Sequence, residues 1–169
     1  KGYWEVKLIS NTMTAGIVDS SISTTSDINL GSKNAVTYDS ETGAINNISG
    51  AVQGETVSSQ YDDDDIIGVA VDADNGAVYF AKNNTYQNSG NPTSGASKTG
   101  GATFTLGNQM LPLAADNSSG SAGNHQYNFG NAPFSISSGN ADANGYGNFE
   151  YAPPSGYYSL CTKNLAEYG

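Results

Sequence analysis

Four consecutive aspartates at residues 62–65 are the first groups in this sequence whose type and spacing suggest chemistry. Adjacent carboxylates repel one another, and Ca²⁺ relieves such repulsion because it binds hard oxygen ligands. In an extended chain neighbouring side chains point to opposite faces, so only alternate residues such as Asp62 and Asp64 converge. A Ca²⁺ site needs about six or more oxygens. We therefore predict a solvated acidic loop without metal or other cofactor, and keep Asp62 and Asp64 as ligands in the alternative interpretation.

The remaining reactive residues do not form a catalytic pattern. His125 is the only histidine and alternates with aromatic residues, which is typical of a packed strand, and Cys161 lies among Tyr and Leu residues as a buried thiol would. The sequence has no Gly-x-Ser-x-Gly nucleophile elbow. None of its five Glu residues is followed two positions later by Asp, so the Glu-x-Asp-x-x-Glu pattern of sandwich glycosidases is absent. We predict a protein that is not an enzyme, with a carbohydrate-active enzyme as the alternative.

Aromatic and amide side chains in or beside polar loops are the candidates for ligand binding. They are Tyr61, Tyr86, Asn88 and Tyr146, and two of them belong to the long polar segment 83–101. Tyr and Asn suit sugar rings and peptide backbones, through stacking and paired hydrogen bonds. The alternative interpretation is that these tyrosines cap the edges of the core.

Composition narrows the classes of partner. The net charge is −10, with six Lys and no Arg. A nucleic acid or an anionic membrane surface attracts clustered cations, which this chain lacks. No apolar run approaches the roughly 20 residues that span a bilayer. We therefore predict no nucleic-acid partner and no membrane insertion.

Short alternating segments separated by turn clusters dominate the 169 residues, and no amphipathic helix stands out. This pattern predicts a single all-β domain, an antiparallel β-sandwich with long polar loops. Its expected strands are residues 3–10, 16–22, 34–38, 45–49, 51–57, 65–72, 77–82, 102–106, 110–115, 125–129, 148–151 and 157–162. Residues 83–101 and 137–147 are expected to be loops without regular structure.

The first strand is expected to be half-buried. Trp4, Val6 and Leu8 fall on one face of residues 3–10, whereas the other face carries Glu5 and Lys7. The alternation therefore predicts a core face and a solvent face.

The clearest turn is Asn75-Gly76, between two apolar strands. This pair favours a two-residue type I′ turn, which would place Asp72 opposite Tyr79. A longer turn with a Gly bulge is the alternative and would shift the register by one. The two-residue turn predicts one shared core face, made of Ile67, Val69, Val71 and Phe80.

Two motifs give the sequence a family resemblance. Residues 2–6 read Gly-Tyr-Trp-Glu-Val, and residues 65–83 contain Ile-Gly-Val-Ala, Asp-Asn-Gly and a closing Lys-Asn. Both are similar to the opening strand and central hairpin of the SPRY (B30.2) domain, although Asn84 replaces the family's usual Gly. The resemblance implies a bent, concanavalin-like β-sandwich over residues 1–169, as part of a longer chain.

The C-terminal third extends the resemblance. Residues 127–134 resemble an Asn-Phe-Gly-x-x-Pro-Phe strand, and residues 153–165 resemble a Pro-x-Gly-Phe-x-x-Leu-Cys-Thr-x-Asn-Leu ending. That ending is similar to SPRY-like domains in structural proteins of tailed bacteriophages. It implies a non-enzymatic virion module on the capsid or tail exterior, in multiple copies. Its partners would be other virion proteins and a host-surface glycan or protein, and a purely architectural domain is the alternative.

Overall fold

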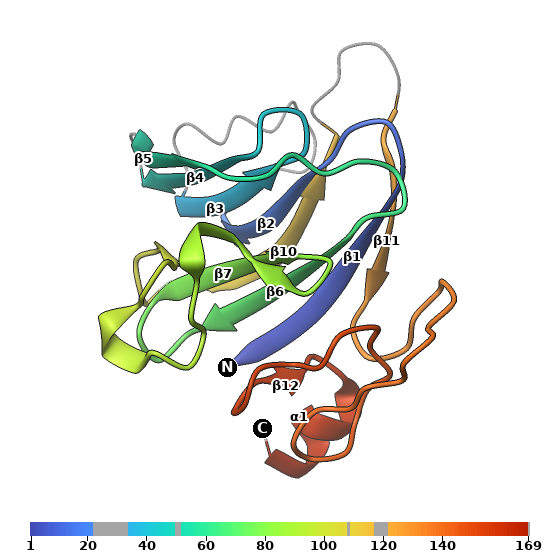
Figure 1. Cartoon of the computed structure of the whole chain (residues 1–169). Coiled ribbons are helices and arrows are strands. Elements are labelled where there is room, and N and C mark those ends of the chain that lie inside the picture. Colours follow the sequence, from blue (N-terminus) through green and yellow to red (C-terminus); the bar gives the residue numbers. More distant parts are fainter. Residues whose placement is uncertain (22–33, 50–51, 108, 117–121, 169) are drawn as a thin grey trace.

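Two β-sheets pack face to face in the computed structural model, which describes residues 1–21, 34–49, 52–107, 109–116 and 122–168 (Figure 1). The first sheet has the order β11 (Asn124–Asn128), β1 (Gly2–Ser10), β6 (Ile66–Asp72), β7 (Ala77–Lys82) and β8 (Thr85–Tyr86), with β12 (Tyr158–Ser159) beside β1 and β9 (Ala102–Thr103) beside β7. The second has the order β10 (Met110–Ala115), β2 (Thr14–Asp19), β3 (Asn34–Asp39), β4 (Ala44–Ser49) and β5 (Val52–Val57). The predicted antiparallel sandwich is therefore confirmed; the β1–β12 pair alone among these pairs is parallel.

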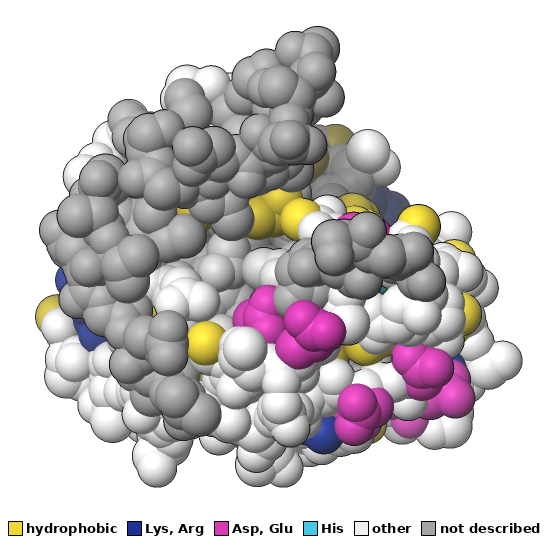
Figure 2. All heavy atoms as spheres, turned by 90° about the horizontal axis from the view of Figure 1, so that it is seen from above, with side chains coloured by type: hydrophobic (Ala, Val, Ile, Leu, Met, Phe, Trp, Pro, Cys, Tyr) yellow, Lys and Arg dark blue, Asp and Glu magenta, His cyan; other side chains and the backbone are white. Residues whose placement is uncertain are grey.

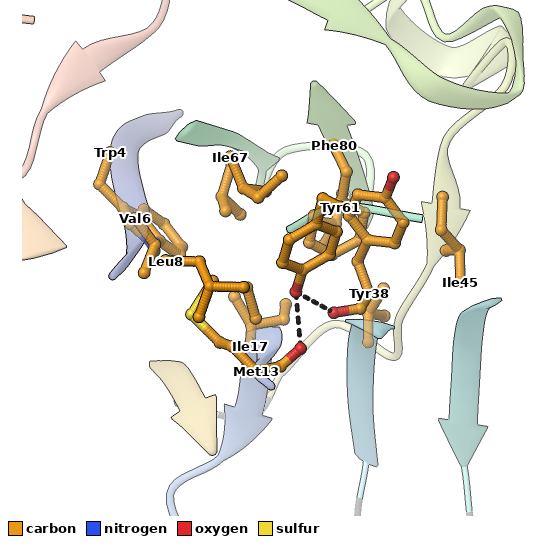
Figure 3. Close-up of a cluster of buried hydrophobic side chains, with 14 residues drawn as sticks. Trp4, Val6, Leu8, Met13, Ile17, Tyr38, Ile45, Tyr61, Ile67 and Phe80 are labelled. Atoms are coloured by element: carbon orange, nitrogen blue, oxygen red, sulfur yellow. Dashed lines mark hydrogen bonds between the residues drawn. The ribbon is translucent and has the colours of Figure 1, made fainter. Parts of the chain in front are cut away.

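The core lies between the sheets and follows the alternation of the strands. Trp4, Val6 and Leu8 of β1 point inward, as predicted, and meet side chains of β2 and β3 (Figure 3). Aromatic rings fill the space beside them, with Tyr38 5.5 Å from Phe80 between ring centroids. Burial of such large apolar side chains stabilises each by about 1.5–3 kcal/mol relative to exposure.

The prediction that β1 has a solvent face is wrong for most of the strand. Tyr3 is 2% exposed and Glu5 is fully buried. The C-terminal segment covers this face, and the Phe149 ring meets the Tyr3 ring edge-on at 5.1 Å. Lys7 and Ile9, further along this face of β1, keep partial exposure. Thus the first half of β1 is buried on both faces.

The β6–β7 hairpin has a four-residue loop, not the two-residue turn that Asn75-Gly76 predicted. Asp72 pairs with Ala77, so the register moves by two positions along β7. The cause is the Asp72 carboxylate, whose Oδ1 accepts the backbone N–H groups of Asp74 and Asn75 at 3.0 and 3.1 Å. An even shift preserves the faces of a strand, so Ile67, Val69 and Phe80 stay in the core and Val71 packs against it.

Several other predicted boundaries change. The segment expected as strand 157–162 contains only β12 and then enters a helix that was not predicted, α1 (Thr162–Tyr168). Strand 102–106 shortens to β9, and residues 148–151 contribute one bridge, between Asn140 and Phe149. Residues 83–101 hold β8 and two short 3-10 helices, η2 (Gln87–Ser89) and η3 (Gly95–Ser97), contrary to prediction. Ile22 and Ala51, at the ends of two predicted strands, lie outside the described residues.

Within the described ranges, the chain has no helix with the length and apolar character needed to cross a membrane.

Candidate functional site: an apolar groove beside the first strand

Tyr61, predicted as a ligand-binding residue, is part of the core. It is 1% exposed, and its hydroxyl donates to the carbonyl oxygens of Met13 and Tyr38, at 2.8 and 2.9 Å (Figure 3). Its ring centroid lies 4.8 Å from that of Tyr38. This corrects the prediction: Tyr61 ties β2 to β3 and presents no surface to a ligand.

The other three predicted binding residues have separate environments. Tyr86 packs against the cluster that contains Tyr79, and burial raises the pKa of its phenol. Asn88 is exposed, with a positive φ of 51°, and donates to the carbonyl of Gly100 at 3.3 Å. Tyr146 donates to Glu167 at 2.6 Å. These contacts place the three side chains in separate environments, and the binding role predicted for them stays a prediction.

Two of the four carboxylates in the acidic run pair with lysines. Asp64 is exposed and lies 2.8 Å from the Lys7 ammonium, and Asp65 lies 3.0 Å from that of Lys82. Asp62 is exposed to solvent and donates its backbone N–H to the Asp65 carboxylate at 2.8 Å. Among the described residues, no three His, Cys, Asp or Glu side chains are grouped in a way that suits a metal.

Large exposed hydrophobic side chains gather elsewhere, at two adjoining cavities of about 410 and 520 Å³. We call the two cavities together the apolar groove; both are lined by Lys1 and Leu160. The five large hydrophobic residues that are exposed in the described part of the chain all line one or both cavities: Leu106, Leu111, Tyr158, Leu160 and Leu165. Single exposed leucines are ordinary, whereas their concentration along one depression makes it the candidate binding surface.

The groove lies at the end of the sandwich where the N-terminus, β12 and α1 meet (Figure 1). The first cavity reaches toward the core, where Trp4, Ile17 and Phe104 line it. The second is bounded by β12 and α1 through Tyr158 and Leu165. In the view from the opposite end of the molecule, exposed carboxylates gather on one part of the face, with hydrophobic side chains visible in smaller patches (Figure 2).

Trp4 lines the first cavity, but its indole nitrogen is buried from solvent. The side chain is 2% exposed, and its indole N–H has no acceptor among the described residues. A buried donor without a partner costs about 1–3 kcal/mol, and native proteins contain few of them. Because a water-sized group cannot reach the nitrogen, this donor does not open onto the cavity.

The charge balance in the groove differs from that of the whole chain. No carboxylate lines either cavity, and Lys1 is the only charged residue that does. Its ammonium lies 2.8 Å from the buried Asp72 carboxylate, and this hydrogen bond raises the pKa of Lys1. Burial opposes ionisation of Asp72, but the hydrogen bonds from Lys1 and Asn75 outweigh it and lower the Asp72 pKa. The cation at the groove is therefore already neutralised.

Two buried carboxylates hold the C-terminal segment that forms the second cavity. Glu5 Oε2 accepts the backbone N–H of Glu150 at 3.1 Å, and Oε1 accepts that of Tyr151 at 2.8 Å. Burial raises the pKa of the Glu5 carboxyl, although its donors oppose the shift. Asp142 accepts the Ser159 N–H at 2.8 Å and the Asn164 amide at 2.7 Å. Burial opposes ionisation of Asp142, but these and other donors lower its pKa.

The sequence interpretation did not identify the groove residues. Leu106, Leu160 and Leu165 are isolated leucines in polar surroundings, and the fold brings them to one side of the molecule. The available signal was the C-terminal motif at residues 153–165, which supplies Leu160 and Leu165 but was used only for its family resemblance.

Comparison with known proteins identifies a family for this chain. A family model described as "SPRY domain" matches residues 1–109, from β1 into the segment before β10. A crystal structure of a human SPRY domain is similar at 19% sequence identity, over 66% of this chain and 74% of that chain, with a TM-score of 0.41. The comparison with curated proteins found no match. Since the family match spans more than half of the sequence, the chain belongs to the SPRY domain family.

Proposed function

We propose that this domain is a non-catalytic binding module that holds a segment of another protein in the apolar groove. The observation that carries the proposal is the concentration of the exposed large hydrophobic side chains at the two cavities. An apolar depression of this kind on a soluble domain is typical of a protein-interaction surface. Family membership supports the same function, because SPRY domains usually mediate protein–protein interactions and are generally non-catalytic.

We also propose that the module belongs to a structural protein of a tailed bacteriophage, exposed in multiple copies on the capsid or tail. Support comes from the resemblance of residues 153–165 to the ending of SPRY-like domains in such proteins. Those residues supply β12, the start of α1 and one wall of the groove. The partner would be a neighbouring virion protein or a host-surface protein.

Binding of a host glycan is the second candidate function, and it would use the loops, not the groove. Asn88 is exposed and offers an amide, and Tyr86 and Tyr146 keep part of their rings accessible. Sugar recognition depends on paired hydrogen bonds, which the leucine-rich groove lacks. The two candidate functions therefore assign binding to different surfaces.

Selection from a displayed random-peptide library distinguishes these surfaces. Leu106→Asp with Leu165→Asp places a charge in each cavity at side chains that are 49% and 65% exposed, so the fold should be retained. Asn88→Asp with Ala96→Asp is the matched control, because it adds the same charge at exposed positions in the 83–101 segment. We expect peptides selected on the wild-type domain to lose at least tenfold in affinity for the groove variant and to bind the control normally.

Peptides that bind the groove variant as well as the wild type would contradict the groove assignment. Loss of binding in the Asn88/Ala96 control alone would move the site to the loops. Labelling of intact particles with an antibody against the domain tests the virion proposal separately, and an unlabelled particle that contains the protein would contradict exterior exposure.

A further inference from the structure

We infer that Asn144 is a site of spontaneous deamidation in the folded protein, and that the fold protects the same dipeptide at Asn75. Asn144-Gly145 and Asn75-Gly76 are the two places in the sequence where Gly follows Asn. Gly favours this reaction because it has no side chain to hinder the backbone nitrogen and rotates freely. The inference concerns a covalent modification and does not depend on the proposed function.

The reaction joins the side chain of Asn to the backbone of the next residue. The backbone nitrogen of Gly loses its proton and attacks Cγ of Asn, and ammonia leaves as the five-membered succinimide ring closes. Water then opens the ring at either carbonyl, which gives aspartate or isoaspartate. Water is the only other reactant, so the rate depends on whether the fold lets the glycine nitrogen reach Cγ.

The Asn75 site is held at the centre of the first sheet. Gly76 is buried; its N–H donates to the Asp72 carbonyl at 2.8 Å, and its carbonyl accepts the Phe104 N–H at 3.1 Å. The Asn75 amide donates to the Asp72 carboxylate at 2.8 Å, and that carboxylate is also paired with Lys1. Freeing the glycine nitrogen therefore means opening the β6–β7 loop together with its contact to the segment after β9, which is a costly local unfolding step.

The Asn144 site lies at the tip of the loop 140–149, which a single bridge closes. Gly145 is exposed, and a Cβ built there meets no atom within 4 Å. Its N–H donates to the Asp142 carbonyl at 2.9 Å, and the Asn144 amide donates to Asn164 Oδ1 of α1 at 2.9 Å. Breaking these two hydrogen bonds frees the tip without displacing a strand, so the reactive geometry is reached more often here than at Asn75.

Deamidation at Asn144 changes the second cavity, which both Asn144 and Asn164 line. The product carries a carboxylate oxygen where the amide donor stood, so it faces Asn164 Oδ1, which is also an acceptor. Asn164 is held in this orientation, because its amide donates to the Asp142 carboxylate at 2.7 Å and to the Ser159 carbonyl at 3.0 Å. Two opposed acceptors repel, so the modification weakens the contact between the loop and α1.

Peptide mapping of the full chain tests the inference without any substitution. The folded protein is incubated at mildly alkaline pH, which favours the deprotonated glycine nitrogen, and samples are taken over time. Cleavage after lysine places Asn75 in peptide 34–82 and Asn144 in peptide 99–163. Mass spectrometry locates each converted residue, and a parallel incubation in urea at the same pH gives the rates in the unfolded chain.

We expect Asn144 to convert about tenfold faster than Asn75 in the folded chain, because more hydrogen bonds must open at Asn75. The two rates should become similar in urea, where both dipeptides are equally accessible. Asn144→Asp reproduces the charge of one product, and Asn88→Asp is the matched control at an exposed loop position. Hydrogen exchange of the Leu165 amide, which donates to the Cys161 carbonyl at 3.2 Å, should be severalfold faster in Asn144→Asp and unchanged in the control.

Conversion of Asn75 in the folded chain as fast as that of Asn144 would overturn the inference. So would an unmodified Asn144 in the folded chain when the chain in urea reacts. A difference that persists unchanged in urea would show that the sequence and not the fold sets the two rates, which also overturns it. Unchanged Leu165 exchange in Asn144→Asp would overturn the effect on the second cavity, whereas the proposed function is judged by the library selection on the Leu106/Leu165 variant.

Discussion

Glu5→Gln tests whether the buried carboxylate holds the C-terminal segment on the sandwich. Both oxygens of Glu5 act as acceptors: Oε1 receives the Tyr3 hydroxyl at 3.4 Å and the Tyr151 N–H at 2.8 Å, and Oε2 receives the Asn128 amide at 3.0 Å and the Glu150 N–H at 3.1 Å. Glutamine has the same shape, but its NH₂ group faces two donors and can accept neither.

The magnitude follows from those two orphaned donors. Each buried donor left without an acceptor costs about 1–3 kcal/mol, which gives about 2–6 kcal/mol before compensation. The neutral amide is easier to bury than a carboxylate, in line with the raised pKa of Glu5, so part of the loss is recovered. We expect the free energy of unfolding to fall by about 2–4 kcal/mol.

Urea denaturation followed by tryptophan fluorescence measures this change, because Trp4 is the neighbour of Glu5 in β1. Glu41→Gln is the matched control, since Glu41 is exposed and should change stability by less than about 0.5 kcal/mol. A Glu5→Gln stability within 0.5 kcal/mol of wild type would refute the assigned hydrogen-bond role of the carboxylate.

Three further predictions use other parts of the fold. Because the pKa of Asp142 is lowered in the folded state, its ionised carboxylate stabilises the fold fully above the unfolded-state pKa of about 4, and this stabilisation is lost as the pH falls toward the folded-state pKa. Asp142→Asn should therefore make the stability of the domain less dependent on pH in this range, as measured by acid unfolding followed by circular dichroism. Gly16→Ala would place a methyl group 2.0 Å from the Val36 carbonyl oxygen and should prevent folding. Gly107→Ala is the comparison, because its methyl group meets no atom within 4 Å and only the positive φ should cost about 1 kcal/mol of stability. Soluble yield and the thermal melting temperature of the two variants measure the difference. Tyr61→Phe removes the donor to two buried carbonyls and should lower unfolding free energy by about 1–3 kcal/mol; an unchanged value would show that these bonds contribute little.

The local residue pattern was enough to predict which face of a strand is buried when the paired strand comes next in the sequence. The core face of the β6–β7 hairpin was predictable because alternation of Ile67 and Val69 is a property of one strand. Its register was not, because Asp72 bonds the turn N–H groups and selects a longer loop than Asn75-Gly76 favours alone. The even size of the shift is what kept the face prediction right.

Distant contacts explain what local pattern missed. Glu5 reads as a solvent-facing strand residue, and nothing near it shows that donors at Glu150 and Tyr151 will cover it. Tyr61 stands beside an acidic run and reads as a loop residue, yet its hydroxyl joins two strands of the other sheet. The groove needs Leu106 and Leu165 together, although 58 residues separate them in the chain (positions 107–164).

The scarcity of cationic side chains determines how the buried carboxylates of this chain are stabilised. With six Lys and no Arg, the chain satisfies its buried carboxylates mainly with amide and hydroxyl donors, as at Glu5 and Asp142. Asp142 binds Ser159 and Asn164, which line the second cavity, whereas the first cavity is lined mostly by residues of the sandwich, together with Leu160. The two halves of the groove therefore depend on different interactions. We expect protonation of Asp142 to weaken its hold on Ser159 and Asn164, and so to affect the second cavity more than the first.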